Sequence, residues 1–173
     1  MISNSDELIG MIKQLEEIEF VTPRVDFFGL VNTQDLSVSA QFIGFLPEVE
    51  TRVQKGFIFV EGEAFQATKH AILSTGLKEK LNIKTGSEVT VVSPTLIGGI
   101  NAMDLNVTGI FSTGFSDVDN GTIYLPLPDA QKILDSNLVD KLIIKLKDED
   151  KIRDVMDKIQ KILGTNSDLQ VRD

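Results

Sequence analysis

The first 45 residues of the chain show two hydrophobic periods, one after the other. In residues 5–18 the apolar side chains recur at helical spacing behind Ser5, which can cap a helix, so this stretch predicts an amphipathic helix. After Pro23, apolar residues lead through a polar turn into the alternating run from Leu36 to Phe42. Alternation on both sides of a polar turn is typical of a β-hairpin.

The middle of the chain is rich in short strand patterns separated by glycines. Two short helices interrupt them: Thr75 to Leu81 predicts one, and Pro128 suits the first position of the other. The segments with a strand pattern are residues 57–60, 71–73, 89–92, 105–111 and 122–125.

The last third changes pattern again. Leu142 to Leu146 has the pattern of a buried strand, and Asp148 can cap a helix with one apolar face that Gly164 ends. Leu169 and Val171 then predict a last strand. This region is therefore predicted to be a β-α-β unit.

Together these patterns favour an α+β fold. The helix and hairpin at the start and the β-α-β unit at the end each carry an apolar face that neither can bury alone. We therefore expect the two ends of the chain to pair into one α/β layer, with the β-rich stretch between them inserted as a second subdomain.

Composition narrows the class of protein. With 17 Lys and Arg against 26 Asp and Glu, the formal net charge is −9, which repels phosphate backbones and anionic lipid surfaces. Nucleic acid is thus not expected as a partner. The cysteine count of zero excludes disulfides and thiolate metal sites. No apolar run reaches the roughly 18 residues that cross a bilayer.

The chain offers little for catalysis. A Ser-His-Asp arrangement would have to use His70, the sole histidine, and no Gly-x-Ser-x-Gly pattern accompanies it. Lys78, Lys80 and Lys84 have no aromatic residues between them and are expected to be helix-surface charges. We predict no catalytic, cofactor-binding or metal site.

One acidic stretch comes closest to a metal site. Asp117, Asp119 and Asn120 resemble the start of a calcium loop, but Gly121 comes one residue too early and Leu127 stands where an EF-hand needs glutamate. Asn-Gly is also a strong turn dipeptide. We predict an acidic turn here, with a metal site as the alternative.

Residues 93–101 predict a hairpin tip or loop with an apolar pair, Leu96 and Ile97. The double glycine Gly98-Gly99 lacks the spacing and the flanking helix of a phosphate-binding loop. An exposed apolar tip can mark a contact with a partner or a membrane. The alternative is that both side chains fold back onto the core.

Two stretches resemble a known family. Residues 21–53 combine a Pro-Arg strand, a hairpin and a Gly-x-x-Pro-Glu-x-Glu corner formed by Gly44, Pro47, Glu48 and Glu50. This stretch resembles the start of the extracytoplasmic core domain of the ABC transporter permeases that include the LolC/LolE and MacB types.

The second stretch, residues 70–93 followed by residues 105–134, resembles the same domain. It has a short helix, a turn at Gly86, a strand at Gly109-Ile-Phe, the acidic turn, another strand and an Ala-Gln helix. The resemblance runs over most of residues 5–173 in one order. In this family the acidic turn is architectural, so the resemblance implies that Asp119 shapes a turn.

The resemblance implies a two-part fold and a location. A porter-like α/β subdomain, discontinuous, would comprise residues 1–47 and 138–173, and a β-rich Sabre-type subdomain would comprise residues 48–137. In the full permease this segment lies between the first two transmembrane helices, on the extracytoplasmic, periplasmic face of the bacterial inner membrane.

The resemblance also implies a mechanical function without an active site: ATP-driven motion is transmitted to a substrate or partner, in lipoprotein release or export. The expected partners are a cytoplasmic ABC ATPase, a second permease copy or paralogue, and a periplasmic carrier or outer-membrane component. Lipoprotein-releasing members dock a carrier through a hairpin with nearby arginine and glutamine. Here residues 93–101 form a shorter equivalent and residues 102–104 include no arginine. Leu96 and Ile97 are the candidate contacts; the alternative function is that of a stand-alone soluble ligand-binding protein or enzyme.

Overall fold

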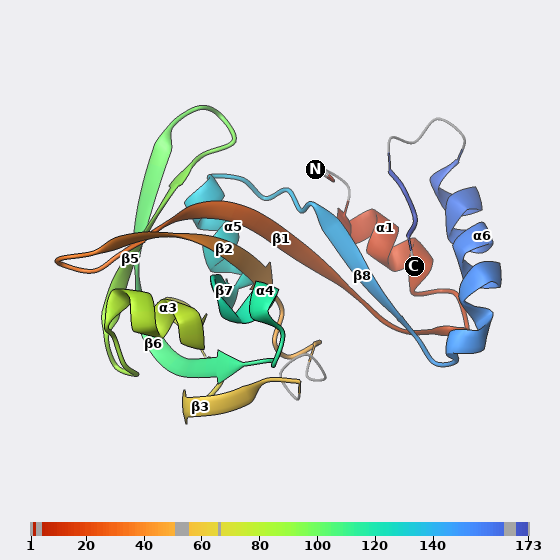
Figure 1. Cartoon of the computed structure of the whole chain (residues 1–173). Helices are drawn as coiled ribbons and strands as arrows, with labels where there is room; N and C mark the ends of the chain where they lie inside the picture. The colour runs from red at the N-terminus through yellow and green to blue at the C-terminus, as the bar shows by residue number, and fades with distance from the viewer. Residues whose placement is uncertain (1, 3–4, 51–55, 66, 165–168, 173) are drawn as a thin grey trace.

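The computed structural model describes residues 2, 5–50, 56–65, 67–164 and 169–172. Figure 1 shows two lobes, joined by the long strand β1 and by the segment that runs from α5 to β8. We call residues 25–139 the ring lobe and residues 5–24 with 140–172 the terminal lobe. The elements are α1 (Ser5–Ile12), β1 (Ile18–Asn32), β2 (Ser37–Phe45), β3 (Ile58–Gly62), β4 (His70–Ser74), α3 (Thr75–Leu81), β5 (Glu88–Pro94), β6 (Ile100–Ser112), α4 (Ser116–Asp119), β7 (Thr122–Pro126), α5 (Leu127–Leu134), β8 (Lys141–Leu146), the 3-10 turn η1 (Glu149–Lys151) and α6 (Ile152–Leu163).

Strand β1 runs through both lobes (Figure 1). Its first half, Ile18 to Arg24, pairs antiparallel with β8 in the terminal lobe. Its second half, Val25 to Asn32, pairs antiparallel with β2 and, near its end, also with β5. The predicted hairpin is therefore confirmed, and its first strand is also the physical link between the lobes.

The ring lobe is built on strands that close on themselves. In order, β2, β7, β4, β6, β5 and β1 are neighbours, and β1 returns to pair with β2. The β2–β7 and β4–β6 pairs are parallel, and the others in the ring are antiparallel. Because the ring closes, each of its strands has a hydrogen-bonded neighbour on both sides. This makes the lobe stiff.

Two buried clusters stabilise the ring lobe. The larger one fills the ring and includes Phe42, Val91 and Leu105, with Leu77 of α3 and Ile133 of α5 packed onto it. The second is aromatic, with ring centroids 4.6–5.7 Å apart in the contacts among its buried members. Its rings belong to Phe45, Phe57, Phe65, Phe111 and Tyr124.

The terminal lobe has a separate core. Ile12 of α1, Val21 of β1 and Ile159 of α6 are buried together, at 2%, 2% and 4% exposure. Helix α6 begins behind Asp148, whose side chain accepts a hydrogen bond from Asp150 N as predicted for a cap, after a single 3-10 turn. No helix among the described residues is both long enough and apolar enough to cross a membrane.

Two predicted elements differ from the structure. The helix predicted over residues 5–18 ends at Ile12, and Ile18 instead opens β1 and pairs with Leu146. The last strand predicted at Leu169 and Val171 is absent from residues 169–172, although both side chains pack against the cores. In both places the apolar spacing correctly indicated burial, but burial does not fix the backbone hydrogen bonds.

The division into residues 1–47 with 138–173 and residues 48–137 stays a prediction. Strand β2 lies within residues 1–47 of that division, yet it pairs with β7, which lies within residues 48–137. We propose that the first boundary lies inside β1, between Arg24 and Val25, where the pairing partner changes from β8 to β2.

Candidate functional site

The turn between β5 and β6 carries the predicted apolar tip. Thr95 organises it: its backbone N–H donates to Gly99 O (2.9 Å), its O accepts from Gly98 N (3.2 Å), and its Oγ1 accepts from Gly99 N (2.9 Å). Gly98 has φ +93°, a conformation that residues with a side chain rarely adopt. The glycines therefore serve the turn of a hairpin.

Helix α5 braces one side of this hairpin. Leu96 N donates to Leu134 O (3.2 Å), and Asn101 Nδ2 donates to Lys132 O (2.8 Å). The side chains of Leu96 and Ile97 nevertheless remain 47% and 81% exposed. They do not fold back onto the core, and their role as partner contacts stays a prediction.

The apolar surface continues from the tip onto the sheet. Leu30 of β1 lies opposite Val92 of β5, which lies opposite Ala102 of β6. In the next row, Pro94 lies opposite Ile100, and Ser93 Oγ donates to Phe28 O (3.5 Å), which keeps β1 beside the hairpin. We call these side chains the outer apolar face: Phe28, Leu30, Val92, Pro94, Ile100 and Ala102.

Strand alternation explains why this face points outward. Phe27 is buried in the ring and stacks on Phe42 with centroids 4.9 Å apart, so its neighbour Phe28 is directed to the other side and is 75% exposed. Ile100 is 80% exposed and Leu30 42%. Sequence analysis missed Phe28, Leu30 and Ile100; the signal was the Phe27-Phe28 doublet, because only one member of such a pair can face the core of a ring.

A second cluster joins the two lobes. Arg24 forms an ion pair and hydrogen bonds with Glu50, whose side chain is fully buried. Asp26 N donates to Asp140 Oδ1 (2.9 Å), and Lys141 Nζ pairs with the Asp26 carboxylate. Burial raises the pKa of Asp140, although the hydrogen bond from Asp26 N opposes this. These contacts fasten β1 to the segments that follow β2 and precede β8.

A tight contact within the ring lobe lies beside this junction, because Gly44 of β2 is opposite Val25 of β1. A Cβ on Gly44 would lie 2.4 Å from Ala130 Cβ, so α5 packs directly against the backbone of β2. Such an approach is possible only for glycine.

The acidic stretch is a backbone-binding motif. The chain makes the short helix α4 over Ser116–Asp119 and then turns at Asn120 and Gly121, as predicted, with Asn120 at φ −82°. The Asp119 carboxylate accepts hydrogen bonds from Ser112 Oγ (2.6 Å), Thr113 N (2.7 Å), Thr113 Oγ1 (2.9 Å) and Gly114 N (3.0 Å). Asp119 thus shapes the loop after β6. No group of three or more His, Asp or Glu in the described part of the chain could hold a metal ion.

These hydrogen bonds predict a defined pH dependence. Partial burial raises the pKa of Asp119, but the four donors outweigh it and hold that pKa below its ordinary value of 3.8. We expect Asp119→Asn to lower the free energy of unfolding by about 2 kcal/mol at pH 7, as loss of a carboxylate acceptor implies. The pKa of Asp119 is depressed in the folded chain. The difference in unfolding free energy between the unchanged chain and Asp119→Asn should therefore persist down to about pH 4 and narrow only below that pH.

Urea unfolding of the Asp119→Asn variant and of the unchanged chain between pH 7 and pH 3.5 checks this. The matched control is Asp117→Asn, since Asp117 is exposed on the same short helix. A loss of stability equal for the two variants would contradict the role given to Asp119.

The remaining candidate residues are not gathered into one site. His70 begins β4 and pairs with Asn106 in the sheet. Lys78 and Lys80 lie on α3, where Lys78 pairs with Glu61 and Lys80 Nζ donates to Asn120 O (2.7 Å). The structure brings none of them together with the hairpin tip.

This architecture is similar to that of known proteins. The family of MacB-like periplasmic core domains matches residues 2–162. The chain belongs to this family. The resemblance noted in the sequence is thereby confirmed, as is a mixed fold of strands and helices.

Two solved structures share the MacB-like fold. The extracellular domain of the noncanonic ABC-type transporter YknZ from Gram-positive bacteria is 16% identical, with a TM-score of 0.71 over 93% of this chain and 82% of that one. The periplasmic region of MacB from Actinobacillus actinomycetemcomitans is also 16% identical, with a TM-score of 0.68 over 91% of this chain and 72% of that one.

The family features quoted from the sequence meet at the lobe junction. The Pro-Arg strand supplies Arg24, the glycine corner supplies Gly44 and Glu50, and the Ala-Gln helix supplies Ala130. Sequence reasoning identified these residues as a pattern but not as contacts, because Arg24 and Glu50 are 26 residues apart. In this MacB-like domain Arg24 and Glu50 of the pattern join the two lobes, and Gly44 and Ala130 pack α5 onto β2 within the ring lobe.

Proposed function

We propose that this chain is the extracytoplasmic domain of an ABC transporter permease, and that it transmits ATP-driven motion to a substrate or partner outside the inner membrane. Family membership supports the general class. In this proposal the domain has no catalysis of its own. A cytoplasmic ABC ATPase supplies the energy, and a second permease copy or a paralogue completes the working unit.

The observation that carries the proposal is the continuity of β1. Its 15 residues form one strand from the terminal lobe to the far side of the ring lobe. At roughly 3.3 Å per residue this is a span of about 50 Å. Helix α1 and the last described residues lie in the terminal lobe, and the hairpin tips lie in the other lobe (Figure 1). A displacement at the terminal lobe would thus be carried to the tips.

The junction supports a rigid transmission. Arg24 with Glu50 and Lys141 with Asp26 tie β1 to neighbouring segments on both sides of the boundary. Because a closed ring and a continuous strand resist bending, the domain is expected to move as one body.

The finer proposal concerns the contact itself. We place it at Leu96 and Ile97, which the hairpin presents to solvent. Residues 102–104 are Ala, Met and Asp, so no arginine stands there to help dock a carrier. Apolar side chains would therefore make this contact, with a periplasmic carrier in lipoprotein release or an outer-membrane component in export.

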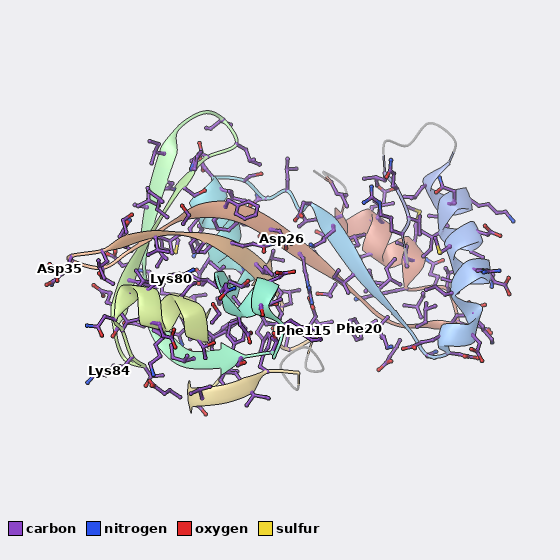
Figure 2. All side chains as sticks on the ribbon, in the orientation of Figure 1. Phe20, Asp26, Asp35, Lys80, Lys84 and Phe115 are labelled. Carbon is purple, nitrogen blue, oxygen red and sulfur yellow. The ribbon has the colours of Figure 1, made fainter. Side chains whose placement is uncertain are left out.

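The proposal predicts a specific pattern of distances in the full-length protein. Tagged protein extracted from native membranes should copurify with an ABC ATPase. The chain has no cysteine, so spin labels at Asp35→Cys and Asp157→Cys are unique within it. Asp35 lies at the β1–β2 tip (Figure 2), and Asp157 is exposed on α6. Vanadate trapping should change the distance between the Asp35 labels of two copies, while the Asp35–Asp157 distance within one copy stays constant.

Two outcomes would contradict the proposal. If no ATPase copurifies, the chain does not work in a permease, and the stand-alone alternative gains support. If the distance within one copy changes on trapping, the lobes move separately and β1 is not a lever.

A further inference from the structure

We propose that the outer apolar face docks an extracytoplasmic protein whose own surface has an apolar centre and lysine or arginine side chains along one edge. The inference deepens the proposed function and rests on it, because that function supplies a partner outside the membrane. It names the docking surface and the chemistry of the partner.

The surface has the properties of a docking site. It crosses three adjacent strands next to the hairpin tip. Phe28 and Ile100 of the face are 75% and 80% exposed, and Ile97 of the tip is 81% exposed. Large aromatic and aliphatic side chains that gather on one face of a soluble protein mark an interaction site. The strands belong to the closed ring, so the face is rigid before binding and little ordering is needed.

Charged side chains along one border of the outer apolar face determine which kind of partner fits it. In the row next to Leu30 and Val92, Asn32 lies opposite Thr90, which lies opposite Asp104. The row after that pairs Glu88 with Asn106. Both acids are exposed, and Thr90 Oγ1 donates to Asp104 Oδ1 (2.7 Å). No lysine or arginine stands in these rows.

The nearby lysines lie outside these two rows. Lys84 is in the turn before Glu88, where its O accepts from Ser87 N (3.1 Å), and Lys69 O accepts from Asn106 N (2.8 Å). Lys141 is paired with Asp26, two residues before Phe28 on β1. Figure 2 shows Lys84 at the opposite end of the lobe from the projecting β5–β6 hairpin. Within the rows that border the apolar side chains the charged residues are Glu88 and Asp104, and these complement a basic edge on a partner.

The same charges disfavour the other occupants. Anionic lipid headgroups would be repelled by Glu88, Asp104 and a net charge of −9. A second copy of this chain carries the same net charge, so the field of each copy opposes their association. A protein with a basic edge fits both the apolar face and the acidic border.

The test uses photocrosslinking in native cells with the full-length protein. A photoreactive phenylalanine analogue replaces Phe28 or, as a matched control, Phe115, which is 72% exposed at the start of α4. Phe115 lies away from the β5–β6 hairpin (Figure 2). We expect an adduct with another protein from position 28 and not from 115. Mass spectrometry should place lysine or arginine beside apolar residues in the crosslinked segment.

Charge reversal then tests the acidic border. With Glu88→Lys in the position-28 variant, capture should fall about fivefold, because a charge at the rim chiefly changes the association rate. Asp117→Lys, an exposed reversal away from the face, should leave capture unchanged. The captured partner, once purified, should bind more weakly as salt is raised.

Peptide binding to the purified chain tests the same surface chemistry outside the cell. The chain should bind an amphipathic peptide with alternating leucine and lysine at least tenfold more tightly than one with alternating leucine and glutamate. Phe28→Ala should weaken the binding of both peptides, whereas Glu88→Lys should reduce the preference between them. Vesicles of anionic phospholipid should not bind it.

Each other outcome rejects the inference. Adducts with lipid or with a second copy, equal capture from positions 28 and 115, capture indifferent to Glu88→Lys, equal binding of the two peptides, or no adduct at all would each overturn it. If an ABC ATPase still copurifies in these cases, the docking chemistry fails while the proposed function stands. If no ATPase copurifies, the proposed function itself has failed.

Discussion

Replacing Glu50 by glutamine while Arg24 is kept is expected to lower the free energy of unfolding by about 3 kcal/mol. Glu50 has no exposed side-chain surface, and the Arg24 side chain is only 15% exposed. The substitution leaves the guanidinium charge mostly desolvated and without its partner. Urea unfolding of the purified chain measures the loss.

Two controls make this result specific. Glu48 is exposed two residues earlier, so Glu48→Gln should change stability by less than about 0.5 kcal/mol. The double variant Arg24→Met with Glu50→Gln should be less destabilised than Glu50→Gln alone, since no unpaired charge remains. If Glu50→Gln and Glu48→Gln have the same stability, the ion pair does not hold the junction.

A single methyl group at Gly44 is expected to have the second large effect. Gly44→Ala should cost about 2–3 kcal/mol of unfolding free energy, because the new Cβ would lie 2.4 Å from Ala130 Cβ and α5 would have to shift. Thermal or urea unfolding measures the change.

The same substitution elsewhere provides the control. At Gly10, in helix α1, an added Cβ meets nothing within 4 Å, so Gly10→Ala should stabilise the chain by about 0.5–1 kcal/mol. Combining Gly44→Ala with Ala130→Gly should recover part of the loss by reopening the space. A Gly44→Ala variant as stable as the unchanged chain would show that α5 adapts without strain.

The first prediction concerns the junction, and it links stability to the proposed function. If the domain works as a lever, substitutions that loosen Arg24–Glu50 should weaken the transmission between lobes. The outer apolar face lies on the ring lobe and its large side chains Phe28 and Ile100 are 75% and 80% exposed, so substitutions there are expected to affect binding and leave stability nearly unchanged.

Local patterns in the sequence predicted many of the elements well. Helix α3 has the predicted bounds, Thr75 to Leu81, because its leucines on one face and the glycine turn that follows specify a short helix directly. The strands of the ring lobe were predicted within a few residues for the same reason: alternation and turn residues are local information. The apolar tip at Leu96 and Ile97 was also identified from its sequence alone.

Elements near the chain ends were harder to predict. Ile18 fits a helical period after Leu15, yet it belongs to β1, since β8 offers it a pairing partner more than 120 residues away in Leu146. The alternation at Leu169 and Val171 correctly indicated burial but not a strand. A periodic pattern states which side chains are apolar, and the hydrogen-bond partner decides the backbone.

The candidate site also depends on pairing between distant segments, which local patterns do not predict. Phe28, Leu30, Val92 and Ile100 come from three separate segments, and their common surface exists only because β1 and β6 both pair with β5. The four donors to Asp119 come from the last residue of β6 and the loop that follows it, and the sequence suggested only a turn.

The sequence by itself determined the family, the acidic charge, most of the short strands and helices and the apolar hairpin tip, since these depend on residue types and spacing within short windows. The tertiary structure alone decided the closure of the ring, the passage of β1 through both lobes, the Arg24–Glu50 joint and the outer apolar face. Each of these requires residues distant along the chain to meet. Such meetings are selected by the packing of the whole molecule and are not specified by any one segment.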